Sequence, residues 1–593
     1  METFQKFKRM PVLLTVPAFA ILLAVFAIPI VQLFLTSLNA PSFSVANYQA
    51  FFTQSANVRV LFQTIEISAV ATVLCLVIGY PTAYLIVAAP KRWRVVLMVL
   101  VFIPWLTNGL VRTYAWVVIL GDSGLINNLL IDFGLISSPL SLIYNRMAVY
   151  IGMVHIMLPT MILPLLSVML GIDKSLVAAA RSMGARPFAA FWRVFLPLSL
   201  PGVRSGSLLT FIFCLGFYIT PQALGGLRDA MLSTFISAQV AAAGSLASIA
   251  ASSFILLAVA IAVLSLVGLD LSSKQGFAGK SAQAYRSSRV PSLGSLLRHL
   301  NEFAILLRVK RWKAQLYRAR INNHWSEVVG AAWIVLVMFF LLFPGLIVII
   351  ISFSPKPYLE FPPTGFSLRW YHSFFADPSW IGAFWTSVKL GVSVAVVSTV
   401  VGTLAAYGLS RAHSSVRQPL TMIILSPITF PSIVVGVSIY YGLFQLGLIG
   451  TLTGIVLAHT VGAVGSVFVI VSATLANFDR RLEQAAQSMR AGPLRTFKRV
   501  TLPLIRPGII GGAVFAFLHS FDDVVITSLI SVFSIRTLPL KMWEDIRHQV
   551  DPTIAAVGSM LTLLPVLWLI VLYVGWWRAK SKAQSTLAGA VPH

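Results

Sequence analysis

The chain has 593 residues, of which 58% are hydrophobic and only 10% are charged. Soluble domains usually carry about a quarter of charged residues, so this composition excludes a soluble globular fold. The formal net charge of +26 comes from basic residues that lie between apolar runs. That arrangement indicates membrane topology and argues against a nucleic-acid partner.

About 12 apolar runs of roughly 20 residues follow one another, and each is long enough to cross a lipid bilayer as an α-helix. A helix satisfies its own backbone hydrogen bonds in lipid. The first run is longer than the apolar part of a signal peptide, and no clear cleavage site follows it, so we expect a retained span. The predicted spans are residues 11–38, 61–89, 95–120, 148–170, 203–220 and 248–269, then 328–352, 384–409, 419–443, 451–473, 509–530 and 557–577.

The sequence therefore predicts an all-α membrane protein that passes the bilayer many times. Lys and Arg gather before the first span, at residues 91–94, between residues 174 and 204, and in the segment 271–326. By the positive-inside rule, this bias predicts that both termini are cytoplasmic. The two cysteines, Cys75 and Cys214, fall inside predicted spans, which indicates neither a disulfide framework nor a metal site.

Two stretches of the sequence match at a constant offset. Each follows the fourth span of its half and precedes the fifth, on the predicted cytoplasmic side. The Ala-rich start favours a short helix, a Gly or Pro breaks it, and a second amphipathic helix is expected to end at Leu-Pro. Such a helix-turn-helix is typical of a docking element, and the alternative is an interfacial helix without a partner. The matching residues are Ala178, Ala179, Ala180, Gly184, Leu196 and Pro197 in the first stretch, and Gln484, Ala485, Ala486, Arg490, Leu502 and Pro503 in the second.

At these residues the sequence resembles the permease subunits of binding-protein-dependent ABC importers. Those subunits share a sequence motif, which is Glu-Ala-Ala, then three residues and Gly, then nine residues and Ile, then one residue and Leu-Pro. The resemblance covers nearly the whole chain, twice. It implies a fold like that of type I ABC importers, with two parallel pseudo-equivalent six-helix halves. The expected domains are residues 1–270, a basic cytoplasmic linker at 271–326, and residues 327–593.

The resemblance also implies partners and a location. The two matching stretches would dock on two ATP-binding ABC subunits, and an extracytoplasmic substrate-binding protein would deliver the cargo. The chain would be a multi-pass protein of the bacterial inner membrane.

The sequence departs from the family motif in both copies. The Glu position holds Ala178 or Gln484, although Glu483 lies one residue earlier. Arg490 replaces the Gly of the second copy. If that turn needs a left-handed residue, Arg costs about 1 kcal/mol more than Gly, unless Gly492 takes the turn instead.

The phosphate-binding loop Gly-x-x-x-x-Gly-Lys-Ser/Thr does not occur in the sequence. The run at residues 276–281 has too few residues between its glycines, and no apolar strand precedes it. We therefore expect no catalytic residues, no cofactor bound by this chain and no metal site, with ATP used by partner subunits. An ion-coupled secondary transporter is the alternative from another class, but it leaves the two matching stretches unexplained.

Placing a charged side chain inside a membrane span costs free energy, so charged residues in spans indicate function. Asp522 and Asp523 lie in the eleventh predicted span, where adjacent side chains on a helix point about 100° apart. At most one is expected to face a pathway and attract a cation. The alternative is that one of them caps a helix or pairs with an Arg. Glu66 and Lys389 align between the two halves, which suggests a salt bridge between them, with separate lipid-edge positions as the alternative.

Four aromatic residues lie near the outer ends of predicted spans: Trp105, Tyr114, Trp116 and Tyr218. Ring faces attract ammonium groups by roughly 0.5 to 2 kcal/mol, so these residues are candidates for a cation pathway. The alternative is an aromatic belt at the membrane interface.

The halves resemble more specifically the two spermidine/putrescine permease subunits. The first half does so at residues 110–116, and the second at residues 361–371 and 520–527. This resemblance implies a small cationic substrate of the polyamine class. Permeases for ferric iron and aminoethylphosphonate are similar, and they remain alternatives.

Overall fold

The computed structural model describes residues 12–267, 323–356, 361, 363–531, 535–548, 552–564 and 566–567. Every regular element within these ranges is helical, which confirms the predicted all-α class. Nearly all of the predicted linker, both chain ends and part of the twelfth predicted span lie outside the described residues.

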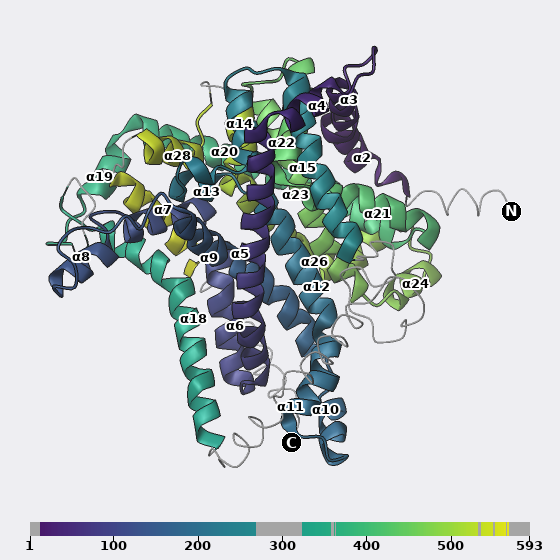
Figure 1. Ribbon diagram of the computed structural model, residues 1–593. Helices are drawn as coiled ribbons and strands as arrows, with labels where there is room; N and C mark the ends of the chain where they lie inside the picture. Colours follow the sequence, from purple (N-terminus) through teal and green to yellow (C-terminus); the bar gives the residue numbers. More distant parts are fainter. Residues whose placement is uncertain are drawn as a thin grey trace.

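The first half begins with one apolar helix, interrupted by a π turn, and ends with another long apolar helix (Figure 1). Its elements are α2 (Val16–Leu22), η1 (Leu23–Ala27), α3 (Ile28–Ser37), α4 (Ala46–Thr53), α5 (Ser55–Ala88), α6 (Lys91–Leu106), α7 (Gly109–Leu120), α8 (Leu125–Asp132), α9 (Arg146–Leu170), α10 (Lys174–Ser182), α11 (Pro187–Ala190), η2 (Phe191–Phe195), α12 (Leu196–Leu215), α13 (Ile219–Leu224), η3 (Leu227–Asp229), α14 (Leu232–Ala241) and α15 (Leu246–Val267).

The second half repeats most of this order. Its elements are α18 (Asn323–Ile351), α19 (Arg369–Ala376), α20 (Pro378–Ser410), α21 (Ser414–Thr429), α22 (Ser432–Gln445), α23 (Leu452–Ala476), α24 (Arg481–Ser488), α25 (Pro493–Thr496), η4 (Phe497–Thr501), α26 (Leu502–Asp522), α27 (Val525–Ile530) and α28 (Leu538–His548). A further apolar helix covers Thr553–Leu564.

Within the described residues, ten helices are long and apolar enough to cross a membrane, and the bent pair α21 and α22 makes eleven if it counts as one span. The third predicted span, residues 95–120, is two helices and not one. Pro104, Thr107 and Asn108 lie where α6 gives way to α7. The Asn108 side chain caps α7 by accepting hydrogen bonds from the N–H groups of Leu110 and Val111 at 2.7 and 3.3 Å.

The same three-helix packing occurs in each half, with α5, α9 and α12 in one and α20, α23 and α26 in the other. One side-chain contact is repeated as well. Thr64 Oγ1 accepts the Leu232 N–H at 2.7 Å, and Ser387 Oγ accepts the Leu538 N–H at 2.7 Å. The two halves therefore share this hydrogen bond as well as their helix packing.

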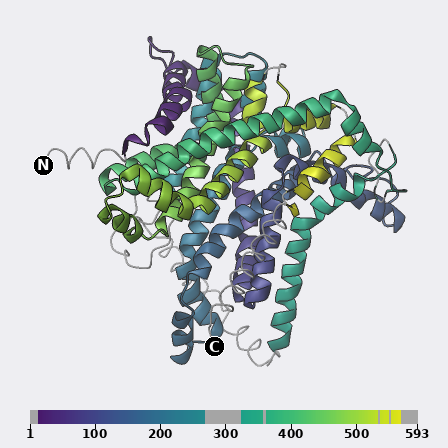
Figure 2. The ribbon, with the colours of Figure 1, turned by 180° about the vertical axis from the view of Figure 1, so that it is seen from behind.

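The halves interlock through their first spans. Helix α3 of the first half packs on α22 of the second, and α18 of the second half packs on α5, α6 and α7 of the first. Hydrogen bonds join the helices of the two halves. One lies between Thr36 Oγ1 and Tyr441 Oη at 3.3 Å, and in the other Trp333 Nε1 donates to Thr82 Oγ1 at 3.0 Å. Figure 2 shows the same arrangement from behind, with the long α20 crossing the molecule. Each hydrophobic core consequently contains residues of both halves.

Close helix packing depends on glycine at Gly508 in α26. A Cβ there would lie 2.7 Å from Thr474 Cβ, which cannot move away by rotation. We expect Gly508→Ala to destabilise the protein by about 1 to 3 kcal/mol through overpacking. The matched control is Gly382→Ala in α20, where a Cβ meets no atom within 4 Å. Thermal unfolding of the purified chains in detergent should lower Tm for the first variant only, and equal Tm values would contradict the packing argument.

Candidate functional site

The first repeat, residues 174–197, begins with the exposed helix α10. Asp173 caps it, because Ser175 N–H donates to Asp173 Oδ1 at 2.9 Å. This hydrogen bond holds the pKa of the Asp173 carboxyl below its usual value. Ala178 and Ala179 are exposed, whereas Ala180 is buried. Gly184, with φ of +87°, then turns the chain into α11.

The second repeat, residues 480–503, makes the same turn with a different residue. Arg490 has φ of +60°, and Gly492 has φ of −66°. Gly492 therefore does not take the turn, and Arg490 adopts the left-handed conformation at a cost of about 1 kcal/mol relative to glycine. Gln484 and Ala485 lie on the exposed surface of α24, and Ala486 is half-buried.

The prediction that the second helix of each repeat ends at Leu-Pro is wrong. The chain stays helical through Leu196 and Pro197, and again through Leu502 and Pro503, into the membrane span. A π turn precedes each Leu-Pro pair, and the wider turn leaves room for the proline ring and its missing N–H. The second helix of each repeat is therefore continuous with α12 or α26.

Both repeats expose large apolar side chains at equivalent positions. Met183 is 83% exposed and Met489 is 84% exposed, while Phe188 and Leu494 are 67% and 66% exposed. Leu176 and Leu482 follow the same pattern. Figure 1 shows α10 and α11 at the bottom edge of the molecule and α24 at its right edge. Exposed apolar groups repeated in this way are typical of an interaction surface.

The contacts that fix the two repeats to their halves differ in part. In the second repeat, the buried Glu483 carboxylate accepts hydrogen bonds from Arg411 and Thr501. The Arg411 guanidinium also lies 3.6 Å from the ring centre of Tyr407. An edge-on ring contact is common to both repeats, with Tyr84 5.4 Å from Phe191 and Tyr407 4.8 Å from Phe497 between ring centres, and Tyr84 also contacts Phe195 at 5.1 Å.

We expect Arg411→Met to destabilise the second repeat by about 3 to 5 kcal/mol, because it leaves the Glu483 charge buried without its partner. The double variant Arg411→Met with Glu483→Leu should recover most of that loss, since an apolar pair of similar volume carries no buried charge. Limited proteolysis of the α24 region in detergent would measure this. A double variant no more resistant than Arg411→Met would contradict the assigned pairing.

Within the part of the chain that the structure describes, the third and fifth spans of both halves are interrupted. In the third spans, α6 gives way to α7 at Thr107 and Asn108, and α21 bends by 102° into α22 at Phe430 and Pro431. In the fifth spans, α12 and α13 are separated by residues 216–218, and α26 and α27 by residues 523–524. Tyr218 therefore lies in an interruption and not in a continuous helix.

The interruptions of one half contact those of the other. Asn108 Nδ2 donates to Asp522 Oδ1 at 2.8 Å, and Ser432 Oγ donates to the Gly216 carbonyl at 3.2 Å. Asp522 is the last residue of α26 and stays partly exposed. The buried Arg112 guanidinium hydrogen-bonds to the Ile156 carbonyl at 3.3 Å. One carboxylate thus lies at a contact between the halves.

Asp523 has a different role, because it lies beyond the end of α26 with an extended backbone. The expectation that both aspartates share one helix is therefore wrong. Asp523 Oδ1 accepts the Thr527 N–H at 2.9 Å and lies 3.5 Å from His459 Nε2. His459 Nδ1 also lies 2.8 Å from Ser520 Oγ. Asp523 precedes the N-cap residue Val524 and accepts a hydrogen bond from the first turn of α27, so its role is the structural one expected as the alternative for this pair.

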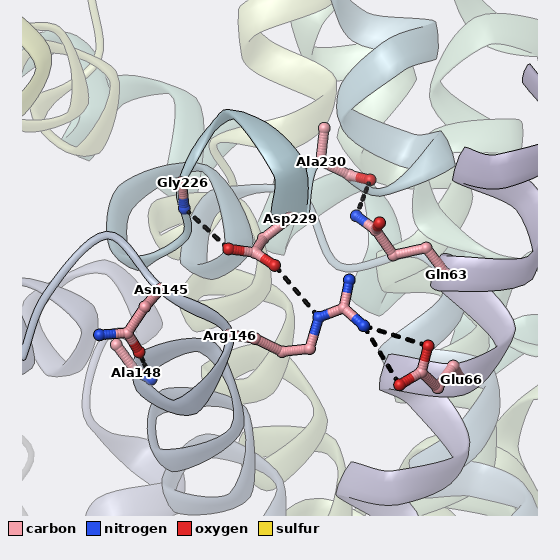
Figure 3. A network of polar contacts seen from close by, with 8 residues as sticks. All are labelled: Gln63, Glu66, Asn145, Arg146, Ala148, Gly226, Asp229 and Ala230. Carbon is pink, nitrogen blue, oxygen red and sulfur yellow. Dashed lines mark hydrogen bonds and ion pairs between the residues drawn. The ribbon is translucent and has the colours of Figure 1, made fainter. Parts of the chain in front are cut away.

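The proposed Glu66–Lys389 salt bridge does not form. Glu66 instead pairs with Arg146 at 3.1 Å, and Arg146 also pairs with Asp229 at 3.1 Å (Figure 3). This network joins α5, α9 and η3, all within the first half. Lys389 is exposed on α20. Glu66 therefore has a structural partner away from the contacts between the halves.

The four aromatic candidates occupy different places. Trp105 is half-buried against Phe102 and Phe515, with ring centres 5.4 and 5.6 Å away. Tyr114 and Trp116 are buried in α7, so neither belongs to a lipid-facing belt. Tyr218 lies 5.8 Å from the Trp543 ring and lines a cavity of about 380 Å³ with Arg547 of the second half. Trp105 and Tyr218 are the two nearest in sequence to the interruptions.

A family model named "Binding-protein-dependent transport system inner membrane component" matches the chain twice, at residues 76–270 and 398–580. The chain belongs to this family. Its permeases are transport subunits and not enzymes, and the double match confirms that one chain holds two permease units. Each match contains one of the two repeats.

Several relatives of this permease are named as permease proteins of polyamine transport systems. The spermidine/putrescine transport system permease protein PotB of Haemophilus influenzae is 37% identical over 196 residues, which are 33% of this chain and 68% of the relative. PotB of Escherichia coli is 34% identical over 30% of this chain and 66% of the relative. The putrescine transport system permease protein PotI of Escherichia coli is 31% identical over 41% of this chain and 89% of the relative. The permease thus spans about two thirds of the PotB proteins it matches.

Several residues of this permease site were not predicted from sequence. Asn108 follows a Thr and precedes a Gly, and this cluster in an apolar run is a usable sign of a helix interruption. His459 was one of several polar residues in a largely apolar span, and nothing in the sequence distinguished it as a partner of Asp523. Arg411 follows a predicted span and is one of two arginines, with Arg417, before the next span, and nothing in the sequence linked it to Glu483.

Proposed function

We propose that this permease forms both membrane halves of an ATP-driven, binding-protein-dependent importer for polyamines. The observation that carries the proposal is the pair of repeats, each continuous with a span through its second helix and each with large apolar side chains exposed at three matching positions. Each repeat docks one ATP-binding ABC subunit. An extracytoplasmic binding protein delivers the substrate at the opposite end, and both termini are cytoplasmic.

In this proposal, transport couples the repeats to the interruptions. Because α12 and α26 run unbroken from the repeats to Leu215 and Asp522, a movement of the docked ATPases reaches the contacts between the halves. ATP binding closes the cytoplasmic side and gives the outward-facing state. Hydrolysis then restores the inward-facing state.

The polyamine assignment rests on two supports. The first is the names of the PotB and PotI relatives. The second is Asp522, a partly exposed carboxylate at the contact between the halves, which is suited to an ammonium group. Trp105 and Tyr218 lie near the interruptions and supply ring faces for the same charge.

Uptake of labelled spermidine and putrescine tests the substrate, in cells that express the permease with its ATPase and binding protein. Unlabelled polyamine, ferric iron and aminoethylphosphonate compete in the same assay. We expect saturable uptake that unlabelled polyamines inhibit and that ferric iron and aminoethylphosphonate do not inhibit. Competition by iron or aminoethylphosphonate alone would leave the importer class standing and overturn the polyamine assignment.

A further inference from the structure

A basic groove distinguishes the second repeat from the first. It has a volume of about 570 Å³ and is lined by Arg490, Gly492, Pro493, Leu494, Arg495, Lys498 and Arg499. Four of these seven residues are cations, and none is an acid. The groove therefore concentrates positive charge without a carboxylate in its lining.

The matching positions of the first repeat have a different chemistry. Gly184, Ala189 and Trp192 stand where the second repeat has Arg490, Arg495 and Lys498. The first repeat thus has small or aromatic residues in place of three cations of the groove, and Arg186 stands where the groove has Gly492. At the seven matching positions the first repeat therefore has two cations, Arg186 and Arg193, against four in the second. Exposed Phe188 and Trp192, with ring centres 5.8 Å apart, give it an apolar surface.

Arg490 lines this groove although its backbone adopts the strained left-handed conformation. It has φ of +60°, where the first repeat has a glycine. Backbone strain of this kind is found at functional sites, where the surrounding structure maintains it. The strained residue adds a guanidinium to the groove.

The acids closest in sequence do not neutralise this charge. Glu483 points inward to Arg411 and Thr501. Asp479 Oδ1 accepts the N–H of Arg481 at the start of α24. Neither carboxylate lines the groove.

We propose that the groove binds a carboxylate-bearing segment of the ATPase that docks on the second repeat, so that the two docking contacts differ in chemistry. This inference rests on the proposed docking function. Leu494 lines the groove and is exposed beside it, so a partner that covers this side chain also covers the four cations. Cations removed from water without counter-charges are strongly unfavourable, so the partner must supply carboxylates there. The first repeat binds its ATPase through Met183, Phe188 and Trp192, with less dependence on charge.

The test measures binding of the purified ATPase subunit to the full chain in nanodiscs of neutral lipid, at several salt concentrations. Arg499→Glu should weaken binding about tenfold and flatten its salt dependence, whereas Arg193→Glu at the matching position of the first repeat should change binding less than about threefold. Arg490→Gly removes the strain and one cation together, so it should weaken binding without loss of folding.

Unchanged binding and salt dependence in Arg499→Glu and Arg490→Gly would overturn the proposal. Binding that responds only when anionic lipid is added would assign the groove to lipid phosphates and overturn it as well. Leu494→Asp separates this inference from the docking function. If that variant also binds the ATPase as the wild type does, docking at the second repeat is itself wrong.

Discussion

Replacing Asp522 by Asn is expected to reduce polyamine uptake by about tenfold or more in kcat/KM. A charged hydrogen bond contributes about 1.5 to 3 kcal/mol, and each 1.4 kcal/mol corresponds to a factor of ten. The amide preserves the size of the side chain and can still accept the hydrogen bond from Asn108, so only the negative charge is lost. Initial rates of labelled spermidine uptake, at equal amounts of membrane-inserted chain, measure the effect.

Asp523→Asn is the neighbouring control. Its carboxylate accepts a hydrogen bond from the first turn of α27 and lies beside His459, so we expect a lower Tm in detergent for this variant. Once corrected for the amount of folded chain, its KM for spermidine should be unchanged. Wild-type kcat/KM in Asp522→Asn would exclude this carboxylate from the substrate pathway.

The double variant Met183→Asp with Met489→Asp is expected to abolish uptake. Both side chains are more than four-fifths exposed, so acidic residues there leave the folded chain intact. They place a charge in the centre of each proposed docking contact, and an unpaired buried charge at an interface is strongly unfavourable. Uptake and co-purification of the ATPase measure the loss.

The matched control is Met183→Leu with Met489→Leu, which retains the apolar area and should keep uptake within about twofold of the wild type. Gel filtration in detergent checks that both double variants remain folded. Normal ATPase co-purification with the acidic pair would show that these exposed residues are not docking surfaces.

The helical class and the duplication were predictable because they depend on features that the sequence displays directly. Apolar runs mark spans, and the matched stretches from Ala178 and from Gln484 mark equivalent positions. These inferences need only local conformation and repetition. The sequence left open whether Arg490 or Gly492 takes the left-handed turn, and the structure assigns it to Arg490.

Contacts between segments were less predictable. Aligning Glu66 with Lys389 identified equivalent positions in the two halves, but equivalence does not imply contact, because α5 packs on α9 and α12 within its own half. Glu66 therefore pairs with Arg146. The interruption at Asn108 was missed because hydropathy averages over a span and does not register one side chain that caps a new helix.

The most direct test of the central claim is reconstitution of the full chain in proteoliposomes with its ATPase and binding protein. Labelled spermidine uptake is measured with ATP supplied to the ATPase side, and separately with an imposed proton or sodium gradient and no ATP. We predict uptake that requires ATP, the ATPase and the binding protein, and that the ion gradients alone do not drive. Uptake driven by a gradient without ATP or the ATPase would contradict the assignment and favour a secondary transporter.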